Sequence, residues 1–390
     1  MDVHKLTTEE RFEADLISMI AFHMRIEDPE KVRVKSEKKT EEDWGAFSKN
    51  GKMMARIVNN HFESWIDGHL VRNGGIGAVS TLPEYRNAGA IREIFKRLLP
   101  EAYLHEEVIS TLYPFNHAFY RKFGYETACW RHDYEFHPGI LCGYQFSGDA
   151  EMWKPGDSVC EYTALYNRFA SSFNLAMLRD DERMLSDHLK GEYYKDRKFG
   201  YLLREEKKPI AYLIFQDVQG NSGAVLSVED LAWDGRKGLN AILGFLARFS
   251  ADYAMIRLFL PASFELLSII QSPRAYEIRQ TVRQDYMIRV INVKRMLEII
   301  AKPANCHFVV RIEDELLSEN NGTWAVNQET AILTSEEPDL TLSIQAFSQL
   351  ATGCVSLSEA LYRNDVTLFS NRDHLEKVFI RKPIFVEERF

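Results

Sequence analysis

The sequence predicts an α+β protein with mixed β-sheets, divided into three domains. The chain has 390 residues, which is too long for one compact core. Helical and strand periodicities alternate along it, and the first and second thirds share the same order of elements. After about residue 286 the pattern changes to short strands around an Asn321-Gly322 hairpin signal.

The composition indicates a globular protein and excludes several functional classes. Hydrophobic residues make up 45% of the chain and charged residues 27%. The net charge is −9, with no long basic block, so we expect no nucleic-acid partner. No signal peptide and no apolar run of about 20 residues is visible, so we expect a cytoplasmic protein without a membrane partner. The five cysteines lack CxxC spacing, so neither a disulfide framework nor a metal site is predicted.

The first domain is expected to span residues 1–145. A short first strand is followed by helical spacing over 9–24. Residues 53–80 are strand-like, and 91–104 return to the helical period. The predicted order is therefore β-α-β-β-β-α, and the Pro- and Gly-rich segment 138–155 indicates a boundary.

The second and third domains are expected at 146–285 and 286–390. Residues 159–173 and 184–194 have helical patterns, 199–218 resemble a hairpin, and 225–253 follow as strand, loop and helix. This repeats the order of the first domain and predicts a degenerate duplication. In the third domain we expect short strands, a helix from Ser343 to Ala351, and a final strand.

The loop before the helix 91–104 has the chemistry of a phosphate site. Backbone N–H groups at a helix N-terminus are unpaired, and the helix dipole adds positive potential. Gly89 would allow close approach of a pyrophosphate, and Arg86 would add a cationic contact. The alternative is that Arg86 is a solvated surface charge and Gly89 an ordinary turn residue.

A second motif follows about 25 residues later. A predicted strand at Val108–Leu112 leads to a helix at Asn116–Lys122 and then to a Phe-Gly-Tyr turn. Phe119 and Phe123 fit an apolar stripe that packs into a core. Tyr120 could belong to the same stripe or reach a ligand, because a phenol can donate a proton in catalysis.

Together the two motifs resemble the GNAT (Gcn5-related) N-acetyltransferases. The resemblance is carried by the strand Ala78–Ser80, the R-x-x-G string at Arg86–Gly89 and FYRKFGY at 119–125. It implies that the strand binds the pantetheine arm of acetyl-CoA and that the loop binds the pyrophosphate. The residues expected to contact acetyl-CoA are Ala78, Val79, Ser80, Thr81, Arg86, Asn87, Ala88, Gly89, Ala90, Ile91 and Asn116.

The same resemblance gives Tyr120 the role of the tyrosine near the cofactor sulfur, which would protonate the departing thiolate. Asn116 and His117 could instead cap the helix without contacting a ligand. Ile91 stands where many GNAT members place a second small residue.

Across nearly the full chain, the domain order resembles the enhanced intracellular survival (Eis) family of acetyltransferases. The third domain is similar to sterol carrier proteins through RIEDELLSENNGTWAV (311–326) and EPDLTLSIQAFSQLATG (337–353), and RNAGAI at 86–91 also fits the family. In that family the terminal carboxylate lies in the active site and serves as a base, and the match here is the α-carboxylate of Phe390. The second domain keeps an R-x-G string at Arg236–Gly238 but no FYRKFGY, so we expect no acetyl-CoA there.

The last residues, KPIFVEERF, are apolar enough to be tucked into the fold, although they could equally form a strand that completes the third domain. An amine pocket could be lined by acidic residues and aromatic walls. The candidates are Glu27, Asp28, Glu387, Glu388, Trp44 and Trp65. The acidic residues could also be solvated charges.

The sequence therefore predicts an acetyl-CoA-dependent N-acetyltransferase that acts on cationic small molecules, aminoglycoside or polyamine-like, by direct transfer in a ternary complex. The Phe390 carboxylate would take the amine proton, Tyr120 would protonate CoA, and backbone amides from Val79 to Thr81 would hold the carbonyl oxygen. The alternatives are a lysine acetyltransferase of proteins and a non-catalytic lipid-binding protein. The family resemblance also implies a homo-oligomer, commonly a hexamer.

Overall fold

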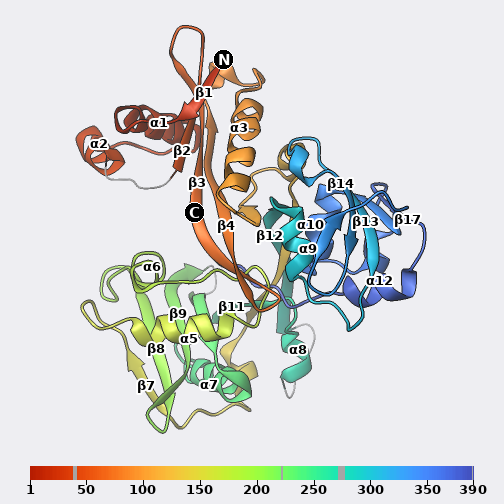
Figure 1. Ribbon diagram of the computed structural model, residues 1–390. Coiled ribbons are helices and arrows are strands. Elements are labelled where there is room, and N and C mark those ends of the chain that lie inside the picture. Colours follow the sequence, from red (N-terminus) through yellow and green to blue (C-terminus); the bar gives the residue numbers. More distant parts are fainter. Residues whose placement is uncertain (38–41, 221–222, 271–276, 389) are drawn as a thin grey trace. The chain divides into compact units, whose positions relative to one another are not determined.

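The computed structural model describes residues 1–37, 42–220, 223–270, 277–388 and 390. The chain forms two compact units (Figure 1). Unit 1 comprises Met1–Cys129, Asp285–Lys382 and Glu388–Phe390, and unit 2 comprises Trp130–Gln284 and Pro383–Glu387. The division into domains at 145 and 285 stays a prediction. Among the described residues, no helix is both long and apolar enough to cross a membrane.

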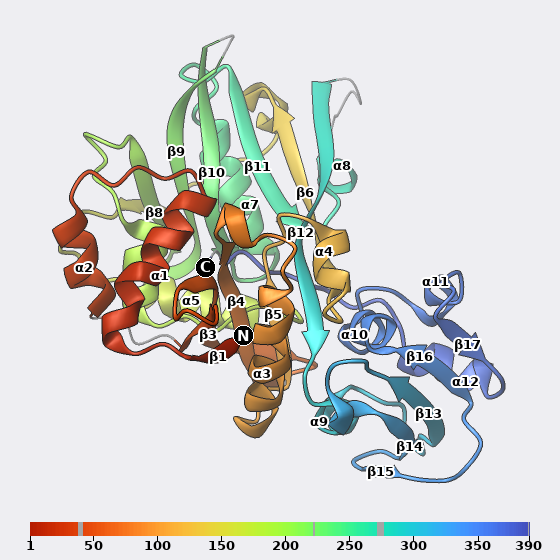
Figure 2. The ribbon, with the colours of Figure 1, turned by 90° about the horizontal axis from the view of Figure 1, so that it is seen from above.

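The N-terminal part of unit 1 has the predicted order of elements, with one additional helix, α2. Its elements are β1 (Asp2–Lys5), α1 (Thr8–Ala21), α2 (Pro29–Glu37), β2 (Glu42–Phe47), β3 (Met53–Ile66), β4 (His69–Thr81), η1 (Pro83–Tyr85), α3 (Ala90–Leu104), β5 (Ile109–Leu112), α4 (His117–Arg121) and the start of β6 (Glu126–Phe136). Helix α1 covers one face of the sheet, α2 packs on α1, and α3 covers the other face (Figures 1 and 2).

Helix α3 anchors this sheet through a continuous apolar stripe. Ile91, Ile94, Phe95 and Leu98 are buried at the i, i+3, i+4 spacing of one helical face. They share a core with residues of β3, β4 and β5, among them Ile57, Ile76 and Leu112. This packing fixes the start of α3 directly after the loop that leaves β4.

The C-terminal part of unit 1 is a small α+β domain around a five-stranded sheet in the order β15-β14-β13-β16-β17. It follows β12 (Ile278–Val290), which pairs with β5 in the other sheet. Its elements are α9 (Val293–Ile299), β13 (Phe308–Glu313), η5 (Ser318–Asn320), β14 (Gly322–Val326), β15 (Ala331–Leu333), β16 (Leu340–Ser343), α10 (Ile344–Thr352), α11 (Leu357–Ala360), β17 (Val366–Leu368) and α12 (Arg372–Val378). The predicted helix at Ser343–Ala351 is confirmed as α10.

The predicted two-residue hairpin turn at Asn321-Gly322 is wrong. Strands β13 and β14 are antiparallel neighbours, but residues 314–321 connect them as a longer loop. The Asp314 carboxylate organises this loop by accepting hydrogen bonds from the backbone N–H groups of Leu316 and Leu317. Its two oxygens also accept hydrogen bonds from Arg289, at 2.8 and 2.7 Å.

Unit 2 repeats the order of unit 1, as predicted for a degenerate duplication. After the end of β6 come η2 (Pro138–Leu141), β7 (Asp149–Met152), α5 (Cys160–Ala170), α6 (Asp181–Arg183), η3 (Met184–Leu189), β8 (Lys198–Glu205), β9 (Lys208–Gly220), β10 (Gly223–Trp233), α7 (Gly235–Ala247), β11 (Met255–Pro261) and α8 (Leu266–Ile269). Tyr162 of α5 packs on Tyr212, whereas Phe245 of α7 packs on Tyr201, so the two helices cover opposite faces of the sheet.

The last residues are tucked into the fold, but the predicted final strand is wrong. Residues 383–387 make a single β-bridge, Asn174↔Ile384, rather than a strand. Phe385 is 2% exposed because it packs into an aromatic cluster of unit 2 with Phe169 and Phe173. Burial of these side chains fixes the chain shortly before its last residue.

Candidate functional site

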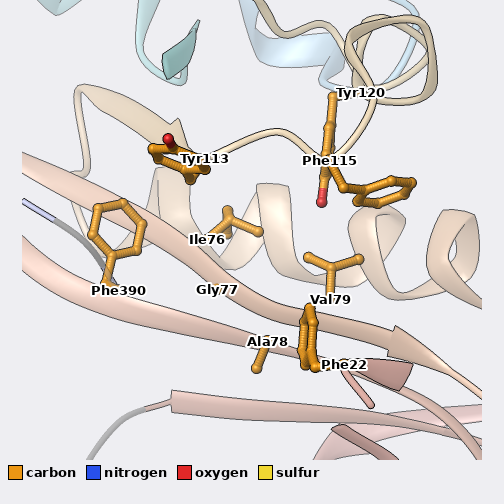
Figure 3. A pocket seen from close by; sticks show the side chains of 9 residues that line it. All are labelled: Phe22, Ile76, Gly77, Ala78, Val79, Tyr113, Phe115, Tyr120 and Phe390. Atoms are coloured by element: carbon orange, nitrogen blue, oxygen red, sulfur yellow. The ribbon is translucent and has the colours of Figure 1, made fainter. Parts of the chain in front are cut away.

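A cavity of about 330 Å³ lies within unit 1, and aromatic and aliphatic side chains surround it (Figure 3). The lining residues come from the end of α1, from β4, from the loop after β5, from α4 and from the chain end. They are Phe22, Ile76, Gly77, Ala78, Val79, Tyr113, Phe115, Tyr120 and Phe390.

The cavity opens where two parallel strands stop pairing. Residues Asn73–Ile76 of β4 pair with Ile109–Leu112 of β5, and the described pairing ends at Ile76↔Leu112. Strand β4 continues to Thr81, whereas the chain after β5 leaves in another direction through Tyr113 and Phe115. The diverging backbones leave the gap that a ligand could occupy.

Strand β4 carries a β-bulge at this opening. Gly77 is opposite Val58 and Ser80 is opposite Arg56, so two residues of β4 face one residue of β3. Ala78 has a φ of +49°, which is unusual for a residue with a side chain. A bulge interrupts the ladder and redirects backbone groups, so the amides around Ala78 and Val79 are candidates for ligand contacts.

Tyr120 reaches the cavity from α4, and its hydroxyl is directed towards Val79 (Figure 3). The residue is 2% exposed, and burial raises the pKa of its phenol well above the usual value of 10. No described residue makes a hydrogen bond with the hydroxyl. The phenol therefore stays protonated at neutral pH and can donate a hydrogen bond into the cavity.

Helix α4 holds Tyr120 in place from its N-terminus. Asn116 is the N-cap, and its side-chain oxygen accepts a hydrogen bond from the Phe119 backbone N–H at 3.0 Å. The side chain thus takes the capping role considered in the sequence analysis. A contact of Asn116 with acetyl-CoA stays a prediction.

Phe390 brings the end of this chain into the same cavity. Its ring packs on Phe62, with 4.9 Å between ring centroids. A Cβ atom at Gly77 would lie 3.3 Å from the Phe390 carbonyl carbon, and one at Gly75 would lie 2.9 Å from its ring. The two glycines therefore make room for Phe390, and its main-chain carbonyl carbon and oxygen lie next to the bulge.

The predicted phosphate loop is present between β4 and α3. Arg86, Asn87, Ala88 and Gly89 are exposed, and Asn87 and Gly89 adopt positive φ angles of 66° and 81°. No hydrogen bond joins the backbone N–H groups of Gly89, Ala90 or Ile91 to another described residue. Their donors and the exposed guanidinium of Arg86 form a site suited to an anion.

The side chains of Ser80 and Thr81 are less available to a ligand than the loop residues. Ser80 is 3% exposed, and its hydroxyl lies 3.2 Å from the Ser18 hydroxyl of α1. Thr81 pairs with Ala55 at the end of the ladder. Ser80 could therefore contact a ligand through its backbone only.

Two family models match the chain. Residues 2–128 match an acetyltransferase (GNAT) domain, the part that contains β4, the loop and α4. This N-terminal part of the chain is therefore an acetyltransferase domain of the GNAT type. Residues 293–386 match a sterol carrier protein domain, so the predicted nature of the C-terminal domain is confirmed. No curated protein matches the chain at a significant level.

Solved structures share the fold along the whole chain. A GCN5-related N-acetyltransferase from Anabaena variabilis is 20% identical, with a TM-score of 0.84 over 98% of this chain and 100% of that one. A protein from Enterococcus faecalis, described as a probable N-acyltransferase, is 20% identical, with a TM-score of 0.86 over 100% and 99%. Eis1 from Mycobacterium abscessus is 17% identical, with a TM-score of 0.84 over 100% of both chains. The fold inferred from the Eis resemblance is confirmed.

The side chains suggested for an amine pocket do not line this cavity. Trp44 is buried in the core beside α3, and Trp65 pairs with Leu70 near the hairpin end of β3. Glu27 is exposed, Asp28 accepts a hydrogen bond from the Lys31 backbone in the first turn of α2, and Glu387 forms an ion pair with Arg131 at 2.7 Å in unit 2. The walls are instead Phe22, Tyr113 and Phe115, which sequence reasoning missed.

The equivalent place in unit 2 is closed. Its strand β10 is bulged between Val228 and Asp230, but Asp230 is buried and forms an ion pair with Arg179 at 2.7 Å. Helix α7 starts after Asp234, and a Cβ atom at Gly238 would lie 2.3 Å from the Ile210 carbonyl oxygen. The absence of acetyl-CoA from unit 2 stays a prediction, which this close packing supports.

Within the part of the chain that the structure describes, no group of three or more His, Cys, Asp or Glu side chains is arranged to hold a metal ion. The polar groups at the cavity are the phenols of Tyr113 and Tyr120, the main-chain end at Phe390 and backbone amides. These groups are suited to moving protons and stabilising an oxyanion.

Proposed function

We propose that this protein transfers the acetyl group of acetyl-CoA to a primary amine in a ternary complex within unit 1. One observation carries the proposal. The Tyr120 hydroxyl, the bulge of β4 and the Phe390 carboxyl group share a cavity, and an anion-binding loop follows β4. The match of residues 2–128 to the GNAT model supports the same chemistry.

Acetyl-CoA is proposed to bind along β4, with its pyrophosphate at the start of α3. The backbone from Ala78 to Thr81 would contact the pantetheine arm, because the ladder with β5 has ended and the bulge interrupts the ladder with β3. Asn87, Ala88, Gly89, Ala90 and Ile91 would surround the pyrophosphate with backbone amides, and Arg86 would add a positive charge. The thioester would then lie between β4 and Tyr120.

The reaction would proceed by direct attack. The amine nitrogen bonds to the thioester carbonyl carbon, and the backbone amides from Val79 to Thr81 stabilise the negative oxygen. The Phe390 carboxylate takes a proton from the amine, directly or through water. The C–S bond then breaks, and the CoA thiolate takes the proton of the Tyr120 phenol, which solvent afterwards restores.

The acceptor is proposed to be a cationic small molecule with a free amine, aminoglycoside or polyamine-like. A carboxylate at the cavity supports this class, because it attracts an ammonium group and can accept its proton. Acetylation of protein lysines shares the chemistry and differs only in the acceptor. The exposed aromatic residues at the cavity mouth do not by themselves favour a small-molecule amine over a protein lysine.

The test is release of CoA from acetyl-CoA, detected with a thiol reagent, in the presence of an amine. Tyr120→Phe should lower kcat by about 10² to 10⁴-fold and leave acetyl-CoA affinity unchanged, because only the proton is lost. One glycine added after Phe390 would move the carboxylate by about 3.8 Å and should also lower kcat strongly. Tyr362→Phe, at a residue that is 93% exposed, is the matched control.

Two results would contradict the assignment. Full turnover in the extended variant would remove the terminal carboxylate from the mechanism. Full turnover in Tyr120→Phe would remove the phenol.

A lipid-binding function is the second candidate, and the sterol carrier match at 293–386 motivates it. Fluorescence titration with phospholipid and sterol would detect it through Trp324, which is buried in this domain. Saturable lipid binding together with no CoA release from any amine would favour this candidate over acetyl transfer.

A further inference from the structure

We infer that the C-terminal domain of unit 1 positions Tyr120 for acetyl transfer, and that Gln345 of α10 is a positioning residue for it. This inference rests on the proposed function, because it takes Tyr120 as the proton donor to CoA. Helix α10 lies beside the end of α4, the helix that carries Tyr120 (Figure 2). Side chains of α10 and of the adjoining strand β12 donate hydrogen bonds to the main chain directly after Tyr120.

Helix α4 is too short to hold Tyr120 without support. It spans five residues, whereas an isolated helix needs about 12 to 15 residues to be even marginally stable in water. Asn116 caps its N-terminus, but the carbonyl groups of its last turn have no further helical turn to pair with. The Tyr120 hydroxyl makes no hydrogen bond with the described residues. The position of the phenol therefore depends on its ring contacts, with Phe115 and Phe119, and on the backbone of α4.

Two side chains from outside the GNAT part hold the end of α4 through its main chain. The Gln345 Nε2 donates to the Arg121 carbonyl oxygen at 3.0 Å, which is the carbonyl directly after Tyr120. The Arg289 Nη1 donates to the Phe123 carbonyl oxygen at 2.8 Å. Both carbonyl groups belong to the helix end and the turn that follows it, where partners from outside the helix are needed. The two donors therefore supply the support that the short helix lacks.

An ion-pair cluster around Glu126 fixes the next part of the chain. The Glu126 side chain is 4% exposed and accepts hydrogen bonds from Arg121 of α4 at 2.9 and 3.0 Å. It also accepts a hydrogen bond at 3.1 Å from Arg363, which follows α11 and donates to the Gln349 side chain as well. Gln349 in turn donates to the Thr127 carbonyl oxygen at 2.7 Å. Because a buried carboxylate stays with its cations, this cluster links α4 to the C-terminal domain.

The position of α4 matters because a proton donor must lie within hydrogen-bond reach of the atom that it protonates. A displacement of about 1 Å can lower a rate by roughly 10²-fold. Loss of the Gln345 hydrogen bond would release the carbonyl nearest to Tyr120, while Arg289 and the Glu126 cluster would still hold the rest of the turn. We therefore expect a small displacement of Tyr120 and no unfolding of unit 1.

The experiment measures CoA release and acetyl-CoA binding in Gln345→Met, with spermidine, neamine or a lysine peptide as the acceptor. Methionine keeps the length of the side chain and removes the donor, and Gln345 is only half-buried. We expect kcat to fall by about tenfold, whereas the Kd for acetyl-CoA in calorimetry and the urea midpoint should stay the same. Gln328→Met is the matched control, because the Gln328 Nε2 donates to the Lys302 carbonyl oxygen at 3.2 Å within the C-terminal domain. Its kcat should equal that of the wild type.

A double variant separates positioning from a general loosening of unit 1. Tyr120→Phe already lacks the proton donor, so adding Gln345→Met should change the remaining kcat by less than about twofold. A general loosening of unit 1 would instead lower kcat by the same factor with and without the Tyr120 hydroxyl.

The outcomes distinguish this inference from the function on which it rests. Wild-type kcat in Gln345→Met, together with a strong loss in Tyr120→Phe, would overturn the positioning role and leave acetyl transfer standing. An equal loss in both backgrounds would also overturn it, because Gln345 would then not act through Tyr120. No CoA release from the wild type with any of these amines would remove the proposed function itself, and the inference with it.

Discussion

Arg289 is the side chain whose loss should damage unit 1 most clearly. It is fully buried, and its Nη2 donates to both oxygens of Asp314 at 2.8 and 2.7 Å. Its Nη1 donates to the Phe123 carbonyl oxygen at 2.8 Å, so it joins the turn after α4 to the C-terminal domain. Arg289→Met would fill most of the same space without a charge or a donor.

The expected cost of Arg289→Met is about 3 to 5 kcal/mol of unfolding free energy. The reason is that the Asp314 side chain is only 1% exposed and would stay behind without its cation. Arg289→Met combined with Asp314→Asn should be more stable than Arg289→Met alone. The amide keeps an acceptor for the loop N–H groups of Leu316 and Leu317, but it carries no uncompensated charge.

The assay is urea unfolding followed by circular dichroism, with the slope of the transition checked for each variant. Arg372→Met is the control, because its side chain is 57% exposed and pairs with Glu376 on the surface of α12. A surface pair of this kind should contribute at most about 1 kcal/mol. If Arg289→Met cost no more than Arg372→Met, or if adding Asp314→Asn destabilised the protein further, the charge argument would be refuted.

Three more predictions follow from the structure. Gly124→Ala should lower the unfolding free energy of unit 1 by about 3 kcal/mol or more in urea unfolding. The reason is that Gly124 has a φ of +84° and that a Cβ atom there would lie 1.5 Å from the Arg289 guanidinium. A smaller loss of unfolding free energy would contradict this packing. The hydrogen bond to Glu107 raises the pKa of His61. The pairing of protonated His61 with Glu107 should therefore stabilise the folded protein fully below about pH 6.5, and this contribution should be lost as pH rises through the raised pKa. The stability difference between wild type and His61→Asn should therefore shrink from pH 5.5 to pH 9, and a constant difference would exclude this linkage. Arg86→Ala should raise the Kd for acetyl-CoA in calorimetry by about tenfold or more, and an unchanged Kd would remove Arg86 from the phosphate site.

The sequence predicted those parts of the site whose structure depends on a single short segment of the chain. The loop around Arg86 and the helix start after Gly89 depend on local turn and helix chemistry, and both lie where the pattern indicated. Tyr120 was identified by its place in a seven-residue motif. The structure explains the glycine of that motif as well, because Gly124 has a positive φ and the Arg289 side chain passes close to it.

The walls of the cavity could not be predicted because they depend on contacts between distant segments. Phe22 lies at the end of a helix, and its position beside Val79 follows from the packing of α1 on the sheet. Phe115 offered one signal, since it is an apolar residue in a loop directly after a proline, where a solvated loop would be polar. The Asn321-Gly322 turn failed for a similar reason, because the loop is organised by Asp314 and by an arginine far away in the sequence.

Unit 2 shows the same architecture with buried side chains, instead of a cavity, at the bulge of the strand. In unit 1 the bulge lies beside Gly77 and Ala78, which leave space, and the cavity borders it. In unit 2 the residue after the bulge is Asp230, which is 1% exposed and has a dense set of partners: Arg179 at 2.7 Å, the Tyr212 hydroxyl at 2.9 Å and His188 at 3.3 Å.

A buried carboxylate needs such partners, because an uncompensated charge would destabilise the fold. Removing Arg179 would therefore weaken unit 2 without creating an acetyl-CoA site. The start of α7 follows the acidic residue Asp234, its first turn carries the basic residues Arg236 and Lys237, and Gly238 packs against the backbone of β9. The absence of acetyl-CoA from unit 2 therefore stays a prediction, and the buried Asp230 cluster at the bulge is the observation that supports it most directly.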